Sequence, residues 1–176
     1  KVVAPVIPMK LIKPVARLAT ASMDQPWGIE AVGAGASPFN GAGITVAVLD
    51  TGIDAKHAAF KGIDLELRNF TDGPDADVDG HGTHCAGTFF GQDVDGKRIG
   101  VARGVKRALI GKVLGPRAGG SDKVAEARLW AVNEGAHVIS MSLGIDFPGY
   151  VKELVGKGFP KELATTIALE GYRANI

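Results

Sequence analysis

Short runs rich in apolar residues recur along the chain, and each is followed by a polar or glycine-rich segment. Residues 44–49 form a continuous, largely β-branched run that is apolar on both faces. Such a run is typical of a central strand in a parallel sheet. Residues 107–114 and 138–143 are predicted to be further strands, and residues 65–70 are a fourth candidate.

Helical patterns stand between and after these runs. Residues 81–92 begin with small residues and fit a buried helix, and residues 121–134 carry apolar positions at helical spacing. Ser121 suits the N-cap of the second helix, and Gly135 is expected to end it. A last helix is predicted over residues 160–173, with proline at its first position. Strands that alternate with helices of this length predict an α/β fold with a mostly parallel sheet flanked by helices.

The beginning of the chain has a different character. Residues 1–26 contain four prolines, with lysine and arginine between short apolar pieces, and no apolar run long enough for a signal peptide. We interpret residues 1–26 as an N-terminal arm or the remnant of a pro-segment, and residues 27–176 as the main domain.

Composition and charge exclude several classes of protein. The 20 basic and 19 acidic residues leave a net charge of +1, so no strong field favours nucleic acid or an anionic membrane surface. No apolar run approaches the length of a membrane span. The single cysteine, Cys85, excludes an internal disulfide and any metal site built from several cysteines.

Two residues stand where chemistry is expected. Asp50 comes directly after the 44–49 strand, and binding sites of open parallel sheets lie just beyond the carboxyl ends of the strands. His81 stands between two glycines at the start of a predicted helix. A catalytic imidazole needs a carboxylate to orient it, which Asp50 could supply. Taken singly, Asp50 could also cap a turn, and His81 could be structural, as we expect of His84, His57 and His137.

Three motifs together narrow the choice, because they occur in the order in which one family carries them. The chain resembles the subtilisin family of serine peptidases, and the second motif, HGTHCAGT, looks most like the proteinase K branch. The resemblance covers roughly residues 27–144 and fades beyond Gly144. The three motifs are Val46–Asp54, His81–Thr88 and Ser140–Gly144.

The resemblance implies a subtilisin-like fold and a role for particular residues. Asp50 would be the carboxylate of a Ser-His-Asp triad and His81 its general base. A peptide or protein substrate would bind as an extended strand between two backbone edges, Ala118–Gly120 and Ser142–Gly144. The residues expected to bind substrate are Gly119, Gly120, Ser142, Leu143 and Gly144.

The same resemblance requires a nucleophilic serine and an oxyanion-hole asparagine, and neither motif occurs in the 176 residues. We therefore expect both to lie beyond this chain, with residues 27–176 as the N-terminal portion of a peptidase domain that is incomplete here. The missing C-terminal portion is then a partner of this segment. A non-catalytic pseudo-peptidase that binds peptides is the alternative. The family is often secreted, but the sequence shows no targeting segment.

Asp50-Thr51-Gly52 also matches the triplet of aspartic peptidases, but those proteins are rich in β-structure, and this chain alternates strands with helices. No cofactor is expected to be needed for the chemistry. Asp75, Asp77 and Asp79 are candidates for a structural calcium site, although an EF-hand is excluded because Ala86 stands where the loop requires glutamate. A solvated acidic loop is the alternative. Cys85, which lies near His81, is expected to be a buried structural thiol.

Overall fold

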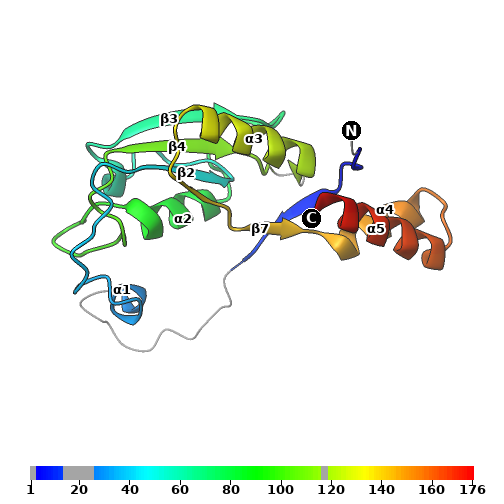
Figure 1. Ribbon diagram of the computed structural model, residues 1–176, viewed down its shortest axis with the longest axis horizontal. Coiled ribbons are helices and arrows are strands. Elements are labelled where there is room, and N and C mark those ends of the chain that lie inside the picture. Colours follow the sequence, from blue (N-terminus) through cyan, green and yellow to red (C-terminus); the bar gives the residue numbers. More distant parts are fainter. Residues whose placement is uncertain (1–2, 14–25, 116–118) are drawn as a thin grey trace.

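A computed structural model describes residues 3–13, 26–115 and 119–176 (Figure 1). The strands are β1 (Pro8–Leu11), β2 (Thr45–Asp50), β3 (Asp64–Asn69), β4 (Arg107–Lys112), β5 (Gly119–Gly120), β6 (Val138–Ser140) and β7 (Leu143–Ile145). The helices are α1 (Trp27–Ala31), α2 (His81–Phe90), α3 (Ser121–Asn133), α4 (Phe147–Gly156) and α5 (Lys161–Asn175), with a short 3₁₀ turn at Ala58–Phe60. Within these described ranges, no helix is both long and apolar enough to cross a membrane.

The main sheet has four parallel strands in the order β3-β4-β2-β6. Residues of β2 alternate between its two faces, so that Ala47 and Leu49 pack beneath α3 while Val46 and Val48 pack against α2. Figure 1 shows α3 and α2 on opposite sides of the sheet. The predicted α/β fold with a flanked parallel sheet is therefore confirmed.

A second, smaller sheet lies next to the first and contains the N-terminal segment. Strand β1 is in its centre and pairs antiparallel with β5 on one side and with β7 on the other. Met9 stands opposite both Gly119 and Ile145, and Lys10 stands opposite Gly144. The arm predicted for residues 1–26 thus contributes a strand, while residues 14–25 lie outside the described part of the chain.

Helices α4 and α5 form a pair that packs around Leu154, Ala164 and Ala168. In Figure 1 this pair extends from β7, away from the main sheet and its covering helices. It contacts the N-terminal segment, because the Asn175 side-chain amide donates to the Pro5 carbonyl oxygen at 2.9 Å. Helix α4 was not predicted from the sequence.

The structure corrects three details of the sequence interpretation. The predicted strand 138–143 is two strands in different sheets, since β6 ends at Ser140 and β7 begins at Leu143. Ser121 does not cap α3: it is the first helical residue, after Gly120, and its hydroxyl accepts from the Ile7 amide at 3.2 Å. Pro160 is the N-cap of α5 rather than its first residue.

The packing of α3 on the sheet gives a first prediction. The Trp130 ring is 7% exposed and lies 5.6 Å from the ring of Phe70, between centroids, whereas the neighbouring Leu129 is 63% exposed. Trp130→Ala should lower the free energy of unfolding by about 3–5 kcal/mol, because it leaves a cavity between α3 and the sheet. Urea denaturation measures this change. Leu129→Ala is the matched control, and a comparable loss in that variant would contradict the packing described.

Candidate active site

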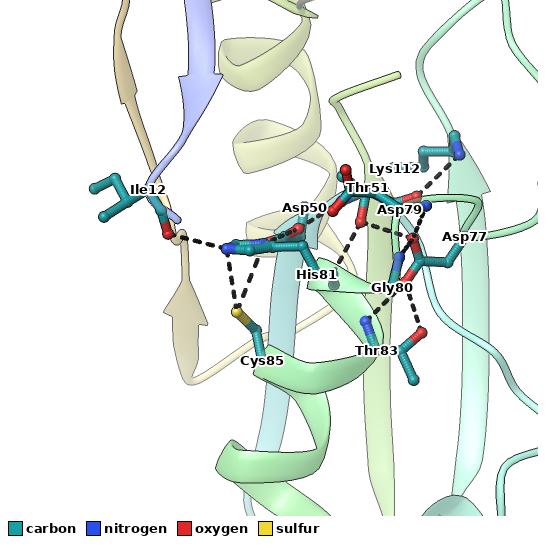
Figure 2. A network of polar contacts seen from close by, with 11 residues as sticks. Ile12, Asp50, Thr51, Asp77, Asp79, Gly80, His81, Thr83, Cys85 and Lys112 are labelled. Atoms are coloured by element: carbon teal, nitrogen blue, oxygen red, sulfur yellow. Dashed lines mark hydrogen bonds and ion pairs between the residues drawn. The ribbon is translucent and has the colours of Figure 1, made fainter. Parts of the chain in front are cut away.

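Asp50 and His81 are in direct contact at the carboxyl edge of the main sheet (Figure 2). His81 Nδ1 lies 2.7 Å from Asp50 Oδ1, and the two side chains are 8% and 1% exposed. The amide of Thr51 donates to the same carboxylate oxygen at 2.7 Å, while Asp50 Oδ2 is buried without a hydrogen-bond partner among the described residues. A buried carboxylate held in this way fixes the ring orientation and favours a positive charge on the imidazole.

The two residues meet because β2 ends where α2 begins. Gly80, the N-cap of α2, has no side chain to bind the first amides of the helix, so other parts of the chain bind them. The Thr51 hydroxyl accepts from the Gly82 amide at 2.9 Å. A Cβ atom on Gly82 would collide with the Gly52 carbonyl oxygen. Only glycine therefore allows α2 to approach the end of β2 this closely.

Asp77 completes the cap on α2 from the loop that precedes it. Its carboxylate accepts from the amides of Thr83 and Gly80, both at 2.9 Å, and from the hydroxyls of Thr83 and Thr51 at 2.6 and 2.8 Å. Burial raises the pKa of Asp77, but these donors outweigh that effect and hold the pKa below its usual value. Asp77 thus ties the loop, the end of β2 and the start of α2 together.

Lys112 supports the same region from below. Its side chain is 2% exposed, and its ammonium group donates to the carbonyl oxygens of Thr51 at 2.9 Å and Ala76 at 2.7 Å. Since Lys112 stands beside Asp50 in the register of β4 and β2, it joins the exit of β2 to the acidic loop. Neither Thr51 nor Lys112 was singled out from the sequence, although Thr51 lies in the motif that begins the site.

The second ring nitrogen of His81 faces the N-terminal segment. His81 Nε2 lies 3.1 Å from the carbonyl oxygen of Ile12, the residue after β1. The amide of Ile12 donates to the Ser142 carbonyl oxygen at 3.1 Å. Both ring nitrogens then face oxygen acceptors. Burial lowers the pKa of His81, but Asp50 and the Ile12 carbonyl outweigh it, and the net pKa is raised.

The structure brings the expected substrate-binding residues to this place. Gly119 and Gly120 form β5, and Leu143 and Gly144 lie in β7, with Ser142 directly before it. Ala118 lies outside the described residues. A cleft of about 860 Å³ opens beside His81 and is lined in part by Ile12, Cys85, Ser140 and Ser142. The sequence analysis missed strand β1, which its alternation of Ile7, Met9 and Leu11 with Pro8 and Lys10 could have indicated.

The sequence profile of the Subtilase family matches residues 41–171, a span that contains every part of the site except the N-terminal segment. The chain belongs to the subtilase family. The resemblance read from the three motifs is therefore confirmed.

Known subtilases with similar sequences are named as proteases. An intracellular serine protease of Paenibacillus polymyxa is 38% identical over 68% of this chain and 39% of its own length. An alkaline protease of Alkalihalobacillus alcalophilus is 37% identical over 78% of this chain and 37% of its own length. The chain thus spans less than two fifths of the length of these relatives.

Two solved subtilase structures resemble this one. A psychrophilic subtilisin-like protease from the Antarctic Pseudoalteromonas sp. AS-11 has a TM-score of 0.57 at 28% identity, covering 66% of this chain and 29% of its own. The nisin leader peptidase of Lactococcus lactis has a TM-score of 0.55 at 25% identity, covering 66% and 37%. The family's fold is therefore shared over about two thirds of the chain.

Two groups of side chains in this subtilase chain bear on metal binding. Among the calcium candidates, Asp77 already accepts from the donors described above, and Asp75 accepts from the Asn69 side chain at 3.0 Å. The other group is Asp50, His81 and Cys85, whose ligand atoms lie within 4.8 Å of one another. Burial raises the pKa of the Cys85 thiol, which favours its neutral form and the structural role expected for it.

The Asp50–His81 contact predicts how His81 titrates. Its raised pKa means that the contact stabilises the fold fully below about pH 6.5, and that this contribution is lost as the pH rises through the pKa of the folded protein. Asp50→Asn should move the NMR titration midpoint of His81 to lower pH. Asp54→Asn, which removes an exposed acid of the following loop, is the control. An unchanged midpoint in Asp50→Asn would contradict the assigned contact.

The network around Asp77 gives a prediction on stability. Asp77→Asn removes the charge that faces four donors and should lower the free energy of unfolding by about 1–3 kcal/mol, measured by urea denaturation at pH 7. Because the pKa of Asp77 is lowered by folding, the difference from the unsubstituted protein should shrink as the pH falls through that pKa. Asp72→Asn, in the same loop, should change stability by less than about 0.5 kcal/mol. Equal losses in both variants would contradict the network.

Proposed function

We propose that the protein containing this chain is a serine endopeptidase of the subtilisin type, with Asp50 and His81 as two members of its triad. One observation carries the proposal: a peptide strand lies between β5 and β7, and the carbonyl that follows it faces His81 at 3.1 Å. That strand is the chain's own N-terminal segment. Substrate peptides are proposed to occupy the same place in the same direction.

The site can perform the first half of peptide hydrolysis once a nucleophile is supplied. Neutral His81 would take the proton of a serine hydroxyl on Nε2, while Asp50 holds the Nδ1 proton and stabilises the imidazolium that forms. The imidazolium then gives its proton to the leaving amine. The nucleophilic serine and the oxyanion-hole donors are proposed to come from outside the 176 residues.

Substrate recognition by backbone pairing follows from the two edges. β5 and β7 offer amide and carbonyl groups to an extended peptide, as in other cases of strand addition. Gly119, Gly120 and Gly144 carry no side chain that could block the main chain of that peptide. This arrangement favours peptide and protein substrates in general, and it leaves selection to the side chains around the strand.

Labelling by a fluorophosphonate, which reacts with activated serines, tests the proposal. The full-length protein should be labelled, and a polypeptide of residues 1–176 should not. His81→Ala in the full-length protein should reduce kcat on a casein substrate by a factor of about 10⁴ to 10⁶, as is typical when a triad member is removed. His84→Ala, on an exposed position of the same helix, should retain activity.

Two results would contradict the proposal. Labelling of residues 1–176 alone would place the nucleophile inside this segment. A full-length protein that is folded, binds peptides and yet is never labelled would instead support the pseudo-peptidase alternative.

A further inference from the structure

The N-terminal strand presents one charged side chain to a specific partner. Ile7 and Met9 are buried, whereas Lys10, between Met9 and Leu11, points to the other face of the strand. Lys10 Nζ lies 3.0 Å from Asp146 Oδ1, with the side chains 51% and 28% exposed. Among the described residues, this is the one ion pair that a β1 side chain makes.

Asp146 is held in place by the fold on several sides. It directly follows β7, and its amide donates to the Pro8 carbonyl oxygen at 2.8 Å, which continues the pairing with β1. It is also the N-cap of α4, where its carboxylate accepts from the Gly149 amide at 3.3 Å. A Cβ atom on Gly149 would collide with the carboxylate, so glycine at this position leaves it room. The carboxylate is therefore positioned by α4 and β7, whichever residue lies opposite.

The charge of Asp146 is secure in this position. The hydrogen bond from Lys10 lowers the pKa of Asp146 and outweighs the effect of burial, with a smaller contribution from the nearby Lys152. An N-cap does not need this charge, because asparagine and serine cap helices about as well as aspartate. What the charge adds at this position is attraction for a cation on the strand between β5 and β7.

We propose that Asp146 is a specificity-determining residue that selects lysine or arginine at the Lys10 position of a bound peptide, two residues before the carbonyl that faces His81. The inference rests on the proposed function, because it assumes that substrates lie where β1 lies. The substrates preferred would then carry a basic residue between two apolar ones, as Met9-Lys10-Leu11 does in this chain.

The partial exposure of the pair limits the size of the effect. Exposed ion pairs are weak and are screened by salt. We expect kcat/KM to favour a lysine peptide over a glutamate peptide by about threefold to tenfold at low salt, since attraction of one and repulsion of the other add. The preference should diminish at 1 M salt.

Hydrolysis by the full-length protein tests the proposal. The probes are the peptide Pro-Met-Lys-Leu-Ile, joined to aminomethylcoumarin, and its relatives with glutamate or norleucine in place of lysine. Asp146→Asn keeps the N-cap and should bring the three values of kcat/KM within about twofold of one another. Glu153→Gln, which removes the acid that pairs with Lys157 on the same helix, should leave the lysine preference intact.

A second measurement needs no turnover and uses the tethered strand itself. Lys10→Glu should increase amide exchange at Ile12, whose amide is bonded to Ser142, by about threefold to tenfold. The charge exchange Lys10→Glu with Asp146→Lys should restore protection. This result decides whether Asp146 reads charge at the Lys10 position even if the protein hydrolyses no peptide.

The outcomes separate the two proposals. If no peptide is hydrolysed while the charge exchange restores protection, the proposed function is wrong and Asp146 still recognises the charge. If peptides are hydrolysed with equal kcat/KM for lysine and glutamate in the unsubstituted protein, the inference about Asp146 is overturned, whether or not its variants fold. A lysine preference that survives Asp146→Asn overturns it as well.

Discussion

The buried hydrogen bond between Asp50 and His81 is the contact on which the arrangement of this site depends. A carboxylate that is 1% exposed costs free energy unless donors surround it, and this one is met by the Thr51 amide and the His81 ring. Bringing that ring within 2.7 Å requires α2 to begin directly against the end of β2. The glycine at position 82, the cap supplied by Thr51 and Asp77, and the buried Lys112 all serve that close approach. The same constraint explains why a loop far from the chemistry carries an acid as heavily hydrogen-bonded as Asp77.

The second sheet depends on a different kind of interaction. Strand β1 is held by backbone pairing on both edges, so its sequence is constrained mainly where its side chains meet something. Met9 reaches the core beneath α3, Lys10 meets Asp146, and the Ile12 carbonyl meets His81. One strand therefore touches the core, the edge of the α4–α5 pair and the site. Because the Ile12 carbonyl favours a protonated His81, the occupied cleft favours the form of the ring that cannot act as a base.

Most of the main sheet could be predicted from local pattern, since strands buried on both faces appear as continuous apolar runs. Strands β2, β3 and β4 were placed within two residues of their ends. The pattern failed where the chain leaves the sheet. Residues 138–143 look like one strand, yet β6 ends at Ser140 and β7 joins another sheet, because pairing with β1 competes for the same segment. Ser121 has the composition of an N-cap, but its hydroxyl binds the Ile7 amide, a partner 114 residues away that no local rule contains.

The sequence by itself determined the fold class, the family and the candidate residues Asp50 and His81, because these rest on short motifs and on the period of apolar positions. The tertiary structure alone decided which groups meet. It brought the N-terminal segment between β5 and β7, set Ile12 against His81, and placed Asp146 beside Lys10, 136 residues earlier in the chain. Such contacts join segments that are distant in sequence, and they form only when backbone edges, helix ends and buried charges must all be satisfied in one packed arrangement.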